Sequence, residues 1–143
     1  MSNFTRTKLN NEGPHRDAIP RDFLPLPADA LRKLLQDFNV RTSARISAIV
    51  SRSGVPVAWV LPDDTQVDNF ATMAATLLGA LEVICSSMKA TTPTQVTVES
   101  DGGLLSIREI TEKMFFVAMA DRRSPAAGKA TDDLLAKARG LLV

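Results

Sequence analysis

The residues that most often perform catalysis are scarce in this chain. It contains one histidine, His15, and one cysteine, Cys85. His15 lies in a polar N-terminal stretch, so a serine or cysteine nucleophile would have no imidazole base within the folded part of the chain. One histidine and one cysteine are also too few for the ligand clusters that hold zinc and similar metals. The sequence therefore predicts no catalytic centre, no cofactor and no metal site.

Four other features could carry chemistry, and each has a simpler interpretation. "AGKAT" at 127–131 has part of a phosphate-binding loop, but Lys129 is followed by alanine instead of serine or threonine, and the upstream glycine is missing. It is interpreted as the first turn of a helix. The aspartate pair at 63–64 suits a turn and a helix cap. The arginine pair at 122–123 is interpreted as a solvated loop, with a site for an anionic partner as the alternative. Cys85 is expected to be a small buried hydrophobe.

The composition excludes further classes of function. With 143 residues, 45% hydrophobic and 23% charged, the chain is typical of one soluble globular domain. A net charge of +1 argues against electrostatic capture of nucleic acid. A single cysteine cannot form an internal disulfide, and the N-terminal stretch has no apolar core of signal-peptide length, so we expect a cytoplasmic protein. The longest apolar stretch, 73–85, is interrupted by Thr76, Gly79 and Glu82, which predicts no membrane insertion.

The elements that could position a binding site follow from hydrophobic periodicity. Residues 1–26 form a polar, proline-containing tail, and 27–143 form the domain. Helices are expected at 27–38, 66–89 and 126–142, and strands at 44–51, 55–61, 94–100, 103–110 and 114–120. The Ser-Gly and Asp-Gly pairs at 53–54 and 101–102 are hairpin turns. The fold class is α+β, a five-stranded antiparallel sheet with helices on its faces, in the order α-β-β-α-β-β-β-α.

The first two strands carry specific expectations. Strand 44–51 should have one buried and one solvated face, with Ser47 on the solvated face. Pro56 should place strand 55–61 at a sheet edge or a frayed corner. Trp59 should lie on one face with Val55, Val57 and Leu61 and bury against the first or the last helix. The alternative leaves it on an open sheet face as a binding hot spot.

The long helix has two apolar sides. Its expected core stripe is Phe70, Ala74, Leu77, Leu81, Ile84 and Met88, widened by Val67, Met73, Leu78 and Cys85. The other side is small or β-branched and almost uncharged: Thr72, Ala75, Thr76, Gly79, Val83 and Ser86. We call this side the small-residue seam. Small side chains let two helices approach closely, so we expect this side to meet a second copy of the chain in a homodimer. Packing beneath another element of the same chain is the alternative.

The strand at 94–100 should take part in the same homodimer. Val96 and Val98 lie in a strand without the lysine or proline that natural edge strands use against association. Pairing with a second copy would satisfy its outer backbone groups.

Three segments together resemble one known family. "ARISAIVSRSGVPVAWVLP" (44–62) is similar to the opening hairpin of the Roadblock family, and "DNFATMAATLLGALEVICSSM" (68–88) is similar to its long alanine-rich helix. "TQVTVESDGGLLSIREITEKMFFVAMADRR" (94–123) resembles its closing strands. The resemblance extends over roughly 28–142. Ser53 departs from it, since an acidic residue is common there, and so does the N-terminal tail.

The resemblance implies a function without catalysis. Roadblock proteins form homodimers or heterodimers in which the long helices pack together and the third strands pair. They serve as platforms for Ras-like GTPases, and some bacterial members stimulate GTP hydrolysis. The candidate GTPase contacts are the polar positions beside the seam: Asp68, Asn69, Thr72, Thr76 and Glu82. The alternative is a profilin- or PAS-like sensor of a small ligand, or an interaction module, with no GTPase partner.

Overall fold

The computed structural model describes residues 27–62 and 66–142. The predicted tail, His15 and the aspartate pair at 63–64 lie outside these residues. The elements are α1 (Ala28–Thr42), β3 (Ile46–Ser51), β4 (Pro56–Val60), α2 (Val67–Ser87), β5 (Gln95–Ser100), β6 (Gly103–Thr111), β7 (Met114–Ala120) and α3 (Ala127–Leu142). The predicted α+β class and element order are confirmed.

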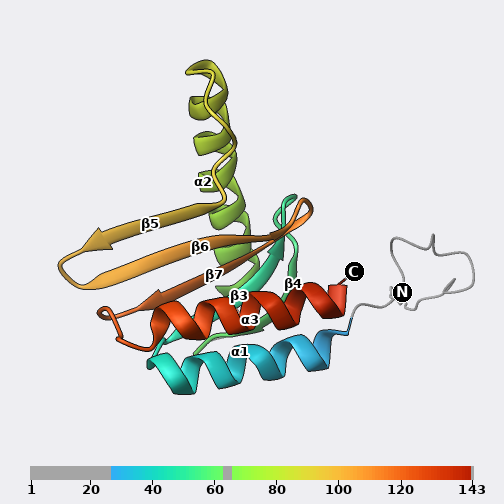
Figure 1. The fold of residues 1–143 in the computed structure, drawn as a ribbon, viewed down its shortest axis with the longest axis vertical. Helices are drawn as coiled ribbons and strands as arrows, with labels where there is room; N and C mark the ends of the chain where they lie inside the picture. Colours follow the sequence, from blue (N-terminus) through green and yellow to red (C-terminus); the bar gives the residue numbers. More distant parts are fainter. Residues whose placement is uncertain (1–26, 63–65, 143) are drawn as a thin grey trace, which may run out of the picture.

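The strands form one antiparallel sheet in the order β4-β3-β7-β6-β5. Helices α1 and α3 lie side by side on one face, and α2 crosses the other face and projects beyond the sheet (Figure 1). The β4 strand is an edge, as Pro56 predicted, and β5 is the opposite edge. The central strand β7 is buried on both faces, as its continuous apolar run predicted.

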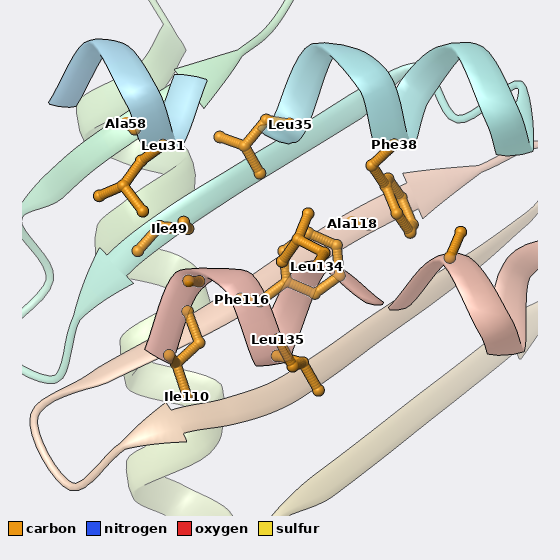
Figure 2. Packing of buried hydrophobic residues seen from close by; sticks show 12 residues of the cluster. Leu31, Leu35, Phe38, Ile49, Ala58, Ile110, Phe116, Ala118, Leu134 and Leu135 are labelled. Atoms are coloured by element: carbon orange, nitrogen blue, oxygen red, sulfur yellow. The ribbon is translucent and has the colours of Figure 1, made fainter. Parts of the chain in front are cut away.

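The larger core lies between the sheet and the layer formed by α1 and α3 (Figure 2). Leu31 and Leu35 of α1 face Leu134 and Leu135 of α3 across this core. The rings of Phe38 and Phe116 meet edge to face, with centroids 5.0 Å apart.

Helix α1 is longer than predicted. The sequence suggested an end near residue 38, whereas the helix continues to Thr42. The Thr42 hydroxyl donates to the Phe38 carbonyl at 2.8 Å, and Ser43 then adopts the left-handed conformation that ends the helix. Thr42 is thereby buried with its hydroxyl satisfied.

The expectation of a solvated face on β3 is wrong. Ser47, Ala48, Ile49 and Val50 are all buried, because β3 lies between β4 and β7 and helices cover both faces of the sheet there. A small serine is tolerated beneath the helix layer where a longer polar side chain would clash.

A β-bulge changes which side chains of β4 share a face. Ile49 pairs with Ala58, but Val50 pairs with Pro56, so Val57 is an extra residue in the ladder. Val57 therefore packs on the side of α1 and α3, while Trp59 packs on the side of α2. The predictions that these two side chains share a face, and that Trp59 buries against α1 or α3, are both wrong. Trp59 is half-buried beside the α2 core.

Candidate functional site

Helix α2 buries only its first half. The residues that face the sheet are Val67, Ala71, Ala74 and Leu78, and past Leu78 no residue of the helix is fully buried. Of the predicted core stripe and its flanking positions, Val67, Ala74 and Leu78 are buried. Ile84 is 56% and Met88 is 75% exposed. The prediction failed because it assumed that the sheet lies beneath the whole helix. The second half instead extends past the sheet (Figure 1).

Much of the predicted stripe forms an apolar surface that the rest of the described chain, 27–62 and 66–142, leaves uncovered. We call this surface the α2 strip: Phe70, Met73, Leu77, Ala80, Ile84 and Met88. Spacings of three and four residues align these side chains along one side of the helix, as in helices that pack against a second helix. Phe70 and Leu77 are half-buried at its base, and Met73 is 66% exposed. The strip therefore offers an apolar surface to a partner.

The predicted small-residue seam lies roughly a third of a turn around α2 from the strip. Thr72, Thr76, Val83 and Ser86 are exposed, and Ala75 and Gly79 are half-buried. The hairpin turn between β3 and β4 covers part of this side, because a Cβ atom added at Gly54 would lie 3.4 Å from the Thr72 Cα and 3.7 Å from the Ala75 Cβ. The first half of the seam thus contacts its own chain, and the second half stays open.

The edge strand β5 lies beside this surface. Val96 packs against the core beneath α2, and Val98, two residues on and on the same face, is 45% exposed. Neither lysine nor proline interrupts β5, whereas Pro56 and the bulge protect the opposite edge, β4. Within the described chain, then, β5 is the edge left open to pairing.

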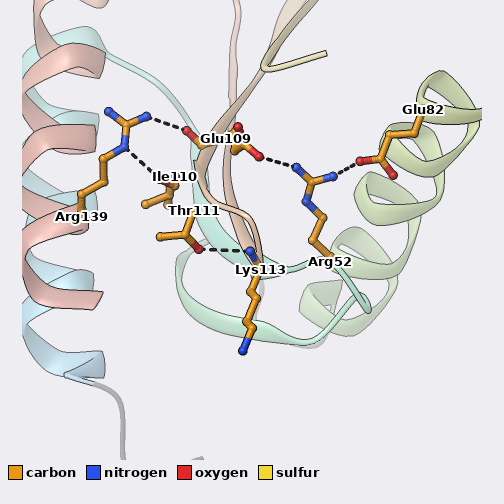
Figure 3. Close-up of polar contacts among 7 residues, drawn as sticks. All are labelled: Arg52, Glu82, Glu109, Ile110, Thr111, Lys113 and Arg139. Carbon is orange, nitrogen blue, oxygen red and sulfur yellow. Dashed lines mark hydrogen bonds and ion pairs between the residues drawn. The ribbon is translucent and has the colours of Figure 1, made fainter. Parts of the chain in front are cut away.

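The candidate partner contacts divide into two groups. Asp68 and Asn69 are exposed in the first turn of α2. The carboxylate of Glu82 instead forms an ion pair with Arg52 of the β3–β4 turn, and Arg52 also pairs with Glu109 of β6 (Figure 3). Glu82 is thus engaged within the chain, which its spacing in the sequence could not reveal.

A cavity of about 430 Å³ lies where α1 ends and α3 begins, lined by Thr42, Ser43, Asp121, Arg122, Arg123, Ser124 and Pro125. Arg45 pairs with Asp121 at 2.8 Å, and Arg123 pairs with Glu99 at 3.1 Å. Arg122 and Arg123 are both exposed, which fits the solvated-loop interpretation of the arginine pair. Cys85 is half-buried, not fully buried as predicted.

Helix α2 is, among the described residues, long and apolar enough to cross a membrane by length and composition. Only 17% of its most apolar 18-residue stretch is buried. The first half is nevertheless fixed to the sheet, and the residues after Leu78 extend only about 14 Å at 1.5 Å per residue. A bilayer core is about 30 Å thick. A protein surface therefore suits the exposed side better than a membrane span does.

Comparisons with known proteins agree with this architecture. The family model of the Roadblock/LC7 domain matches residues 31–120. MglB of Myxococcus xanthus superposes with a TM-score of 0.75 at 10% identity, covering 82% of this chain and 92% of that one. The gliding protein MglB of Thermus thermophilus gives 0.73 at 16% identity, with 81% and 90% covered. A Roadblock/LC7 domain from Streptomyces avermitilis gives 0.71 at 21%, with 78% and 96% covered. No curated protein matches the sequence at a significant level.

Proposed function

The chain belongs to the Roadblock/LC7 domain family, and from this membership we propose that it is a homodimeric regulator or scaffold of a small Ras-like GTPase. The role is non-enzymatic: the chain binds the GTPase and either holds it in an assembly or stimulates its GTP hydrolysis. The similarity of its fold to that of MglB proteins supports a GTPase-associated role. We place this function in the cytoplasm.

The observation that carries the homodimer is the uncovered α2 strip. An isolated domain would leave this row of apolar side chains in water, at a cost of about 25 cal/mol for each Å² of apolar surface. Phe70 and Leu77 at the base of the strip and Val96 of the edge strand β5 pack against the same core, on the face of the sheet that α2 covers. A second copy related by a two-fold axis could cover the strip with its own strip and pair with β5 through its own β5. No other single partner is needed to satisfy both surfaces.

The burial pattern shifts the proposed contact from the small-residue seam towards the strip. We expect Ile84→Glu to abolish the dimer, because it would bury a carboxylate against apolar side chains. Ser86→Glu is the matched control, since it adds the same charge two residues away on the seam side. Sedimentation velocity shows whether each variant is a monomer or a dimer. It is run at tens of micromolar, roughly the range where a stable interface stays assembled. If Ile84→Glu stays dimeric and Ser86→Glu becomes monomeric, the dimer contact lies on the seam instead of the strip.

The GTPase contact is proposed for the exposed polar residues at the start of α2. Asp68 and Asn69, with Thr72 and Thr76 on the following turns, are exposed beside the paired helices. Calorimetry with a Ras-like GTPase encoded in the same genome, loaded first with GDP and then with a GTP analogue, tests the binding. Asp68→Lys should change the association rate and its salt dependence while the fold persists. Asp29→Lys on α1, the far side of the sheet, is the charge-matched control.

The sensor alternative is less well supported. A ligand site usually has an apolar wall with a few converging polar groups. The cavity at the start of α3 is lined largely by polar and charged side chains, including paired charges. If no GTPase in either nucleotide state binds and the dimer persists, a scaffold without a GTPase replaces the proposal.

A further inference from the structure

The second half of α2 is held to the domain by few contacts. No residue from Gly79 to Ser87 is fully buried, and Figure 1 shows this part of the helix standing clear of the sheet. Asp68 and Glu82 are the only charged residues of the helix, and Glu82 lies in this half. Its side chain turns back towards the β3–β4 turn, where it meets Arg52 (Figure 3). Among the described residues, this ion pair is the side-chain polar contact that joins the projecting half to the body of the domain.

Arg52 is itself fixed from several directions. Its backbone N–H donates to the Lys113 carbonyl at 2.9 Å, which binds the β3–β4 turn to the β6–β7 turn. Its second guanidinium nitrogen donates to Glu109 Oε2 at 2.9 Å. The side chain is only 23% exposed, so both ion pairs are shielded from water more than a typical surface pair is.

The bulge in β6 extends this network to α3. The ladder between β6 and β7 shifts between Glu109 and Thr111, which leaves Ile110 as an extra residue. Arg139 of α3 donates to the Ile110 carbonyl at 2.9 Å and to the Glu109 carbonyl at 3.0 Å. The position of Glu109 is thereby supported from the opposite face of the sheet, and Glu109 supports Arg52 (Figure 3).

The cluster of Arg52, Glu82 and Glu109 carries one positive and two negative charges. One guanidinium faces two carboxylates, so removal of Glu82 leaves a matched pair of Arg52 and Glu109. Removal of Arg52 instead leaves two partly buried carboxylates near each other without an ion-pair partner among the described residues, which is the costlier outcome. The two deletions should therefore differ in size even though they break the same contact.

We infer that Arg52 is a positioning residue that tethers the projecting half of α2 to the sheet and so sets the direction in which Ile84 and Met88 are presented. The tether is a property of the single chain. Its consequence for assembly rests on the proposed homodimer, because a two-fold contact along α2 requires both helices to leave their sheets at the same angle.

Hydrogen exchange of the full chain, followed by mass spectrometry, tests the tether. In Arg52→Met, which keeps an unbranched apolar stem, we expect the amides of 79–87 to exchange on the order of tenfold faster, the scale of one lost charge-assisted hydrogen bond. The amides of Val67–Leu78 should accelerate less than those of 79–87, by no more than the weakened dimer contact accounts for. Glu82→Gln should give a smaller acceleration at the same residues. Arg41→Met, which breaks the exposed pair of Arg41 with Asp133 at 3.1 Å, is the matched control and should leave α2 as it was.

The pattern of exchange along α2 distinguishes loss of the tether from loss of the dimer. Loss of the dimer alone would also expose the base of the strip, so it would accelerate exchange in Val67–Leu78 as well. Unchanged exchange at 79–87 in Arg52→Met, or equal acceleration over the whole domain, overturns the inference. If Arg52→Met fails to fold, Glu82→Leu breaks the same ion pair and is compared with the native chain instead. Unchanged exchange at 79–87 in Glu82→Leu would again contradict the tether. If the native chain sediments as a monomer, the homodimer proposal is wrong. The exchange comparison still tests the tether in that case, because the tether lies within one chain.

Discussion

Two serines of β3, Ser47 and Ser51, differ in whether their hydroxyl groups have hydrogen-bond partners. The Ser47 hydroxyl is buried with no hydrogen-bond partner among the described residues. The Ser51 hydroxyl accepts a hydrogen bond from the Val55 N–H at 3.0 Å and supports the hairpin turn. Because an unpaired buried hydroxyl is unfavourable and a paired one is favourable, identical substitutions should have opposite effects.

We predict that Ser47→Ala leaves the free energy of unfolding unchanged or raises it by up to about 1 kcal/mol, since it removes an unsatisfied group at little change in volume. Ser51→Ala should lower it by about 1 kcal/mol through the lost hydrogen bond. Urea unfolding of both variants measures the difference. Equal destabilisation would mean that the Ser47 hydroxyl has a partner after all.

Two glycines provide a second contrast. Gly54 has a φ of 93°, and a Cβ there would lie 3.4 Å from backbone of α2. A Cβ at Gly79 would meet nothing within 4 Å. We predict that Gly54→Ala destabilises the domain by about 1–3 kcal/mol, because alanine is strained at positive φ. Gly79→Ala should stabilise it by up to about 1 kcal/mol through helix propensity. Thermal unfolding checks both signs, and a destabilising Gly79→Ala would point to an unseen neighbour at that position.

Single-residue placement was the least predictable part of the molecule. The periodicity of α2 showed which side chains align, but not how far the sheet extends beneath them, so Ile84 was assigned to the core and is exposed. Trp59 was misplaced because a bulge, which depends on pairing with β3, shifted the alternation at Val57. The role of Glu82 depends on Arg52, thirty residues earlier, and the sequence pattern carries no signal for that contact.

The elements themselves were predictable because their signals are local. The pairs at 53–54 and 101–102 lie at hairpins, and all five predicted strands are present. The end of α1 was missed because Thr42 and Ser43 end the helix through a hydroxyl contact and a left-handed residue, which a scan for apolar periodicity does not detect. The open edge at β5 was expected from its composition, and the strand order places it at the rim of the sheet.

The register of β5 shows which of its residues face outwards. The Glu109 N–H donates to the Thr94 carbonyl at 2.9 Å, and Thr94 and Glu109 continue the register in which Gln95 pairs with Arg108. Antiparallel ladders alternate between bonded and non-bonded pairs. The backbone groups of Val98 therefore face β6, and those of Thr97 face the open edge.

We predict that Thr97→Pro disrupts dimerisation while the monomer stays folded, because the lost N–H points outwards and edge strands tolerate such a proline. Val98→Pro should weaken the monomer as well, since it removes a donor from the ladder with β6. Circular dichroism and sedimentation velocity of the two variants give the comparison. A Thr97→Pro variant that dimerises like the native chain would exclude pairing through β5.

At the scale of the whole molecule, stability and assembly should be linked. The domain has a complete core between the sheet and the helices α1 and α3. Among the described residues, its second core is covered on the outside by α2, a helix that is itself largely exposed. A partner that covers the α2 strip would bind the folded chain and not the unfolded one. Association of this kind stabilises the native state by mass action.

The melting temperature should therefore depend on protein concentration. For a homodimer that dissociates on unfolding, each tenfold increase in concentration adds about 1.4 kcal/mol per dimer, which raises Tm by roughly 2–4 °C. Ile84→Glu should show no such dependence, because the interface is lost, and its Tm should equal that of the dilute native chain. Ser86→Glu should keep the dependence. Calorimetric scans of the three proteins over two decades of concentration measure this dependence. If the Tm of the native chain does not change with concentration, a second copy does not cover the α2 strip. The strip would then belong to a different partner.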